Sequence, residues 1–423
     1  MSKEENVTSL FALMHKLRNT KRKGWHDKNI KRSRVESVAD HIYGCQMLAY
    51  AMQSEFDYDI DIEKVILMLT IHEIGETIIG DLTIEDMSEQ QKSKIERKTV
   101  KELLDLIPNS DLLKNLFEEF ELKETKEAKF AYQIDKAECD LQARLYEQDG
   151  SFDEKYQRYS FTKEWVEFDR GRIAFDNNFD KLLEYIIDND MVIKEHSNNK
   201  IQNVISFYTS TNSLKNIQRT GEIIWKINPD HYGSIAEHIY STQMLAIAIY
   251  LIYETKIDIK KVINMLSIHE LGEIVIGDKS ALLKNNSDRD DEWNGALIIA
   301  GLLSNSINVL SKLSEFNENK TVEANYSKYC DKLAPDMISK IYDQLNLIDL
   351  NNQDGNPLLN NPIVKRHLEA GKSFSEMWIL YGQEAYKYPE PFISISNHAL
   401  NNDIDELYTK KLKLKTSNKN KSI

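Results

Sequence analysis

The sequence predicts an all-α protein made of two related helical bundles. Glycine and proline together account for 22 of the 423 residues, about 5%, against a usual level of about 12%. Sheet-rich folds place these residues in their many turns, so their scarcity favours helices. The length of 423 residues is sufficient for two or three domains that each bury a full core.

An internal repeat reduces that number to two. Residues 35–83 align without a gap on residues 232–280 at an offset of 197, with 26 identities in 49 positions. The same offset matches four residues upstream of this window: Leu17, Asn19, Arg22 and Gly24. Solenoid repeats are much shorter, so we interpret the pattern as a duplicated globular domain. We predict an N-terminal domain at 1–197 and a C-terminal domain at 198–410.

Each copy is expected to be helical along most of its length. In the first copy, apolar residues recur every three or four positions from Val38 to Met52 and again from Val65 onward, which is typical of amphipathic helices. The second of these helices is expected to end at Gly80, because glycine is a frequent C-terminal stop. Further helices are expected at 94–104, 126–146 and 181–187. The basic, apolar-poor segment 411–423 is predicted to be a disordered tail.

Composition excludes several classes of partner. The net charge of −14 repels phosphate backbones and argues against a dedicated nucleic-acid binder. Three widely spaced cysteines indicate neither a disulfide framework nor a zinc knot. The longest apolar run, 244–253, is half of the roughly 20 residues that a membrane span needs, and the N-terminus does not resemble a signal peptide. We therefore expect a cytoplasmic protein with no nucleic-acid or membrane partner.

Candidate metal ligands interrupt the apolar helix faces at matching positions of both copies. They are His41, His72, Glu73 and Asp135 in the first copy and His238, His269, Glu270 and Asp331 in the second. The two histidines are 31 residues apart in each copy. A lone histidine on an apolar face is more often a hydrogen-bonded core residue, but four candidate ligands that recur in both copies favour metal binding.

This set of nitrogen and oxygen donors predicts one divalent ion per domain. Two imidazoles and two carboxylates suit an octahedral ion that keeps water ligands, and the absence of cysteine ligands argues against a structural zinc site. The candidate ions are manganese, cobalt, iron, magnesium and zinc.

The order of these residues resembles a known family. The segments HEIGETIIGD and HELGEIVIGD, each preceded by a histidine and followed by an aspartate, are similar to the HD-domain metal-dependent phosphohydrolases. Within that family they most resemble the branch of the bacterial 5′-deoxynucleotidases, whose Arg-x-Gly-Trp entry motif is similar to RKGW here. Both copies have His-Glu where the family usually has His-Asp. No histidine lies between His72 and Asp135, which by resemblance implies a mononuclear site.

The resemblance also implies roles for residues around the metal. Glu76 and Glu273, four residues after the second histidine, would orient or deprotonate the attacking water, and Asp81 and Asp278 would transfer a proton to the leaving oxygen. Arg22, Trp25 and Arg219 would bind substrate, the arginines through a bidentate contact to phosphate and the indole through a nucleoside sugar or base.

Local charge differs between the copies. Residues 18–34 carry eight basic side chains against Asp27 alone, a net charge of +7, whereas the equivalent segment 215–231 has a net charge of +1. An anionic substrate beside carboxylate ligands needs cations from elsewhere. We therefore expect unequal sites, with the N-terminal one the better nucleotide hydrolase.

These observations predict a metal-dependent hydrolase of phosphate monoesters, above all (deoxy)nucleoside 5′-monophosphates. Three alternatives stay open: a nucleotide-binding regulatory module without turnover, an alarmone hydrolase and a nucleoside triphosphate hydrolase. Domains of the resembled family are generally dimers, so we expect the two copies to pair as an intramolecular pseudo-dimer.

Overall fold

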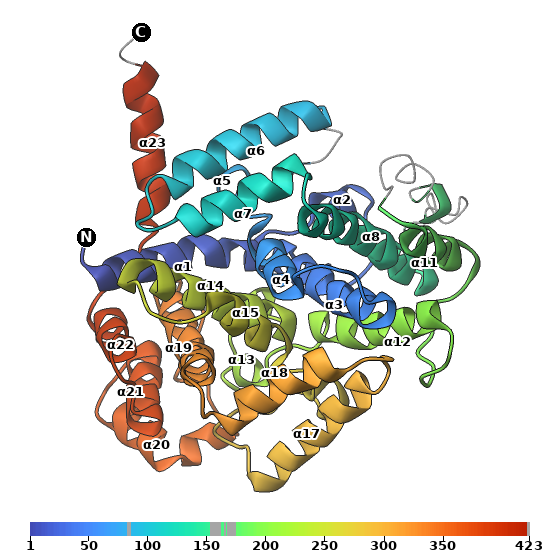
Figure 1. The fold of residues 1–423 in the computed structure, drawn as a ribbon. Helices are drawn as coiled ribbons and strands as arrows, with labels where there is room; N and C mark the ends of the chain where they lie inside the picture. The colour runs from blue at the N-terminus through green and yellow to red at the C-terminus, as the bar shows by residue number, and fades with distance from the viewer. Residues whose placement is uncertain (83–85, 153–161, 165, 167–174, 421–423) are drawn as a thin grey trace.

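The computed structural model describes residues 1–82, 86–152, 162–164, 166 and 175–420, and these residues form helices without a named strand (Figure 1). Two isolated bridges, Lys21 with Ser37 and Gln218 with Ser234, occupy equivalent positions of the two copies. The predicted all-α class is confirmed.

The helices repeat in length and order. The first copy contains α1 Lys3–Asn19, α2 Lys23–Asp27, α3 Val38–Phe56, α4 Ile62–Ile71, α5 Glu76–Ile79, α6 Glu89–Leu104, α7 Asp111–Leu122, α8 Lys126–Gln148 and α11 Asn177–Asp188. The second contains α12 Lys200–Asn212, η1 Ser213–Lys215, α13 Thr220–Ile224, η2 Pro229–His231, α14 Ile235–Tyr253, α15 Ile259–Ile268, α16 Glu273–Ile276, α17 Asn286–Ala300, α18 Ile307–Glu318 and α19 Val322–Gln344. It then adds η3 Pro357–Asn360, α20 Pro362–Glu369, α21 Phe374–Tyr386, α22 Phe392–Asn401 and α23 Leu407–Asn420.

Local sequence signals define the starts of the site helices. Ser37 before α3 and Ser234 before α14 both form capping boxes, with the carboxylates of Asp40 and Glu237 returning to the cap backbone. Such reciprocal bonds satisfy two otherwise unpaired N–H groups and fix the first turn. The same device in both copies places the histidine that follows in the first turn of its helix.

The two copies exchange their first helices. Helix α1 packs against α14 of the second copy, and α12 packs against α3 of the first (Figure 1). At the centre α3 packs on α14 and α4 on α15. Equivalent residues meet there, because Gln46 and Gln243 donate to each other's side-chain oxygens at 3.1 and 3.2 Å. The chain is thus arranged as an internal pseudo-dimer.

The structure bears on three further expectations, which concern the domain boundary, the C-terminal segment and the most apolar helix. The stretch between α11 and α12 contains the predicted boundary at 197, yet the exchange means that each copy's first helix covers the other copy. The segment 411–420, expected to be disordered, continues the helix α23. Helix α14 is long and apolar enough to cross a membrane by length and composition, but 94% of its apolar window is buried among other helices.

Candidate metal centres

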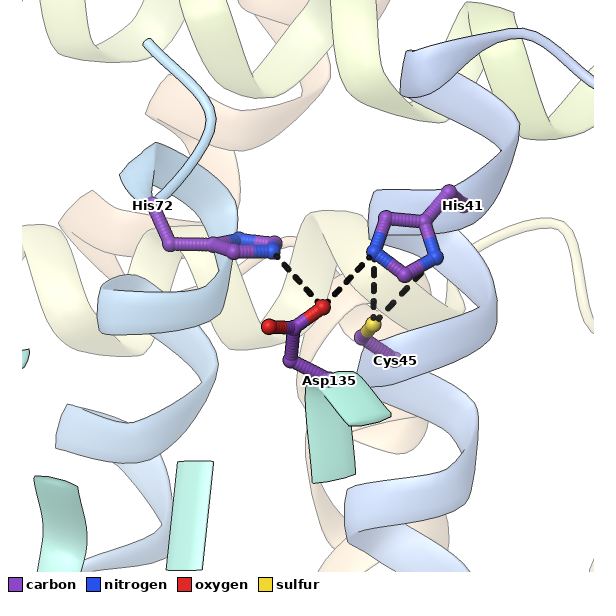
Figure 2. Close-up of side chains that lie close together, drawn as sticks. All are labelled: His41, Cys45, His72 and Asp135. Carbon is purple, nitrogen blue, oxygen red and sulfur yellow. Dashed lines mark hydrogen bonds and ion pairs between the residues drawn. The ribbon is translucent and has the colours of Figure 1, made fainter. Parts of the chain in front are cut away.

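The first cluster joins three helical elements of the N-terminal copy (Figure 2). His41 lies on α3, Asp135 on α8, and His72 immediately after the last residue of α4. Asp135 Oδ1 lies 3.2 Å from His41 Nε2 and 3.8 Å from His72 Nε2. Cys45, one turn along α3 from His41, completes a buried group whose donor atoms all lie within 4.8 Å of one another.

The second cluster contains all four donors predicted for its copy. Asp331 Oδ1 lies 3.0 Å from His238 Nε2 and 3.5 Å from His269 Nε2. Glu270 Oε1 lies 3.5 Å from each of the same two nitrogens. Glu73, the equivalent of Glu270, lies 3.7 Å from His72 Nε2, but the fourth donor of the first group is Cys45.

In each cluster, one ring nitrogen is available to bind a cation. His72 Nδ1 lies 2.7 Å from the Leu69 carbonyl and His269 Nδ1 lies 2.8 Å from the Leu266 carbonyl. A carbonyl only accepts, so each Nδ1 carries the proton and each Nε2 presents its lone pair. Both Nε2 atoms are buried without a hydrogen-bond partner. An electron-pair donor left buried and unpaired fits coordination to a cation, so both clusters could hold a metal ion.

Lysines next to the aspartates keep these carboxylates ionised. Lys136 Nζ lies 2.9 Å from Asp135 and Lys332 Nζ lies 2.8 Å from Asp331. Burial raises the pKa of both carboxyl groups, but the lysines and the neighbouring histidines outweigh it and hold each pKa well below its usual range. The aspartates are therefore charged at neutral pH.

His41 also has a carboxylate partner on its other ring nitrogen, Nδ1. Glu138 Oε2 forms a hydrogen bond with His41 Nδ1, and both side chains are fully buried. Burial and Arg22 lower the pKa of His41, but Glu138 and Asp135 outweigh them and raise this pKa from 6.5 to about 9. Helices α8 and α19 correspond at an offset of 196, which places Ala334 at the position of Glu138.

Glu76 and Glu273 lie at the edges of the clusters. The sequence predicted one helix from Val65 to Gly80, and this prediction is wrong. Helix α4 ends at Ile71, and the chain turns before α5 begins at Glu76. Both oxygens of Glu76 are buried without a hydrogen-bond partner, as is Glu273 Oε2. Burial first, and then the nearby glutamate and aspartate, raise the pKa of each group well above its usual range. A carboxylate whose pKa is raised accepts a proton more readily than an ordinary carboxylate does.

Asp81 and Asp278 hold the entry motif in place. Asp81 Oδ2 accepts a 2.6 Å hydrogen bond from the backbone N–H of Lys23, at the start of α2. Asp278 accepts the equivalent bond from Thr220 at the start of α13. Each aspartate therefore fixes the helix that follows Arg22 or Arg219, which is a structural task that the sequence did not indicate.

The two predicted phosphate-binding arginines face the clusters. Arg22 Nη1 lies 3.5 Å from Glu73 Oε1, and Arg219 Nη1 lies 3.7 Å from Glu270 Oε1. Trp25 differs, because its ring is 6% exposed and its Nε1 donates to Glu36 at 2.6 Å. The structure therefore places Trp25 in a small core beside Tyr146, not on an open substrate surface.

Two arginines of the basic segment 18–34 join the copies. Arg18 is buried and pairs with Glu222 and Glu237 of the second copy, while Arg34 pairs with Asp40 and Glu237. These two arginines therefore account for part of the charge difference that suggested unequal sites.

Several site residues were missed by sequence reasoning. A lysine follows the aspartate in both copies, Lys136 and Lys332, and this repetition was a readable signal. Lys92 and Lys284 approach Glu76 and Glu273 at 3.6 and 2.8 Å, but they do not correspond in the repeat. Glu138 and Cys45 gave no signal, because the second copy has different residues there.

A cleft opens onto the second cluster. Its volume is about 680 Å³, and it is lined by charged and aromatic side chains that include His269, Glu273, Arg289, Lys328 and Tyr386. A small anionic molecule therefore has both space and cations at this cluster.

The fold and the clusters together define a tandem helical protein with two candidate metal centres built from histidine and aspartate. A model of the HD domain family matches residues 14–170 and 211–356, and the chain belongs to this family. It is 32% identical to 5′-deoxynucleotidase HDDC2 of Bos taurus over 146 residues, which are 34% of this chain and 68% of that protein. The human protein of the same name is also 32% identical over 146 residues, 34% and 69% of the respective chains. The namesake from Dictyostelium discoideum is 29% identical over 195 residues, 44% of this chain and 98% of its own.

Proposed function

We propose that the protein is a metal-dependent phosphohydrolase that releases phosphate from (deoxy)nucleoside 5′-monophosphates. The proposal is carried by the unpaired Nε2 atoms of His72 and His269, each turned toward an ionised aspartate and close to a buried glutamate. It is supported by similarity to proteins named 5′-deoxynucleotidase. Localisation in the cytoplasm, as expected for such an enzyme, belongs to the same proposal.

The proposed ligands are His41, His72, Glu73 and Asp135 in one site and His238, His269, Glu270 and Asp331 in the other. A divalent ion bound there lowers the pKa of its water ligand and polarises a phosphoryl oxygen. Manganese, cobalt, iron, magnesium and zinc are all compatible with this donor set.

The surrounding residues supply the acid–base and charge functions. Glu76 and Glu273 accept the proton of the attacking water, since their raised pKa values make them effective bases. Arg22 and Arg219 contribute fork-shaped cations for phosphate oxygens, and substrate would replace their contacts with Glu73 and Glu270.

For the leaving group, we retain a proton-transfer role for Asp81 and Asp278 as part of the proposal. Each is anchored by one backbone N–H at a helix start, so its remaining oxygen is kept in a fixed position. A carboxyl group fixed in this way is suited to hand a proton to the departing nucleoside oxygen.

The test is phosphate release from deoxynucleoside and ribonucleoside monophosphates, assayed separately with manganese, cobalt and magnesium. We expect turnover with at least one ion, and loss of that turnover in a variant that carries both His72→Ala and His269→Ala. Nucleoside triphosphates and an alarmone serve as competing substrates in the same panel. Absence of phosphate release with every ion, from protein shown to bind metal, would refute the proposal.

A further inference from the structure

Glu138 connects the first cluster to the second copy of the repeat. One of its oxygens contacts His41 Nδ1, and the other accepts hydrogen bonds from Lys215 Nζ at 2.6 Å and from the Tyr208 hydroxyl at 2.8 Å. Lys215 and Tyr208 belong to η1 and α12, the exchanged segment that begins the second copy. The groups that orient this carboxylate therefore come from the other half of the chain.

Lys215 is buried in the protein interior. Its side chain is 3% exposed. Besides Glu138, its ammonium donates to Glu36 at 2.7 Å and to Gln142 at 3.1 Å, which uses all three of its N–H bonds. Its backbone carbonyl accepts a 2.9 Å bond from Arg34. Removal of this cation would leave two buried carboxylates without their charge partner.

The repeat provides a natural comparison for Lys215. At the offset of 197 its counterpart is Arg18, which enters the second copy in the same way. The partners of Arg18 are Glu222, Glu237 and Tyr342, at 2.9, 3.4 and 2.7 Å. The position of Glu138 is taken there by Ala334, whose side chain accepts no hydrogen bond. The exchanged segment of the second copy is therefore linked to the first metal cluster through Lys215 and Glu138. Among the described residues, Arg18 of the first copy has no equivalent link to the second cluster.

We propose that Lys215 is a positioning residue for the first metal site. It holds Glu138 against His41 Nδ1, and this contact keeps His41 Nε2 directed at Asp135, where the cation binds. The second half of the chain thus completes the site of the first half. The inference rests on the metal-binding part of the proposed function and not on the substrate.

Cobalt(II) titration of the full chain tests the inference, with visible absorption as the readout of the first site. The second site is removed by His238→Ala and His269→Ala, so that only the first cluster reports. In this background we expect Lys215→Met to weaken cobalt affinity 10- to 100-fold, the usual cost of losing a partner behind a metal-binding histidine. Lys215→Arg, which keeps a cation, should recover part of that loss.

Arg18→Met is the matched control, because it removes the equivalent buried cation from the other side of the same interface. We expect its cobalt affinity to stay within twofold of the background, with the same absorption spectrum. Equal weakening in the two variants would show a general effect of interface damage and would overturn the inference, as would unchanged affinity in Lys215→Met.

Tyr208→Phe provides a second and gentler test, because it removes only one of the two donors to Glu138 Oε1. We expect a smaller loss of cobalt affinity and a shifted absorption spectrum. If Lys215→Met does not fold, as judged by circular dichroism, an unchanged titration in Tyr208→Phe overturns the inference. Hydrolysis is not the readout: metal binding without phosphatase activity would refute the proposed substrate chemistry alone.

Discussion

The two copies retain the same four predicted ligands, but different residues surround these ligands. In the second cluster Glu270 Oε1 lies 3.5 Å from the Nε2 atoms of both histidines, whereas in the first Glu73 Oε1 lies 3.7 Å from His72 Nε2. The first cluster has Glu138 behind His41, and the second has Ala334 at that position. Duplication has therefore preserved the groups that would contact a metal and changed those that hold them.

The contacts at the interface between the two copies also differ from one side to the other. Both copies send a cation from the end of the first helix into the other half, but Lys215 reaches a carboxylate behind a cluster histidine and Arg18 reaches Glu222 and Glu237. The backbones of the two copies are thus similar, but the side-chain contacts across their interface differ. The following predictions separate the properties that the copies share from those that they do not.

The largest effect is expected from loss of a histidine with an unpaired Nε2. His72→Ala should remove metal from the first site only, and His269→Ala from the second only, because each removes a donor from its own cluster. Bound cobalt measured after dialysis should fall by one equivalent in each single variant, and to nearly none in the double variant. A single variant that lost both ions would contradict the independence of the two ligand sets.

The next effect concerns the buried glutamates. Glu76→Gln and Glu273→Gln keep size but lose the proton acceptor, so each should lower kcat of its own site by about 10²- to 10⁴-fold. Metal content should not change. The measurement is steady-state phosphate release in backgrounds where the other site lacks its histidines. A fall in metal content as large as the fall in kcat would make the glutamate a ligand instead of a base.

The interface should depend strongly on its buried cations. Arg18→Met leaves Glu222 without its charge partner beside the buried Glu237, and loss of one member of a buried ion pair costs about 3–5 kcal/mol. Because Arg34 still pairs with Glu237 at 2.9 Å, we expect the lower end of that range. The measurement is the free energy of unfolding in urea.

Lys260→Met supplies the matched control for this stability effect. Lys260 also bridges the copies, through Asp61, but both side chains are more than one-third exposed. Its removal should cost less than about 1 kcal/mol. Equal losses for Arg18→Met and Lys260→Met would show that burial does not govern the strength of these contacts.

The fold class and the repeat could be predicted from sequence because they depend on composition and periodicity. The exchange of α1 and α12 could not. The apolar face of α1 fits a helix such as α3 or α14, and these two helices come from the same repeat. The break after Ile71 was also missed, since the apolar pattern continues past it and only Gly75 marks the turn.

Within the candidate sites, the histidines and aspartates could be predicted because both copies retain them. Glu138 could not, because its role depends on Lys215, which lies 77 residues along the chain in the other copy. Trp25 shows the opposite case. Its motif suggested a surface for substrate, but an indole that finds an internal acceptor such as Glu36 can be buried at little cost.

The last prediction distinguishes the two exchanged helices by the pH dependence of stability. His15 on α1 is buried, whereas its counterpart on α12 is Asn212, which does not titrate. Burial, and secondarily Arg18, lower the pKa of His15 from 6.5 to about 3. The unfolded chain therefore takes up a proton as pH falls below about 6.5, while the folded chain does not until about pH 3. Stability from this group is fully present above pH 6.5 and is lost as the pH falls.

His15→Asn places the residue of the second copy into the first and removes this dependence. By linkage, the wild-type protein should lose about 2 kcal/mol at pH 5 through His15 alone. The difference in unfolding free energy between wild type and His15→Asn should therefore change by that amount between pH 7.5 and pH 5, in favour of the variant. A difference that stays constant with pH would mean that His15 is protonated in the folded protein, and that burial beside Phe11 and Ser241 does not exclude its charge.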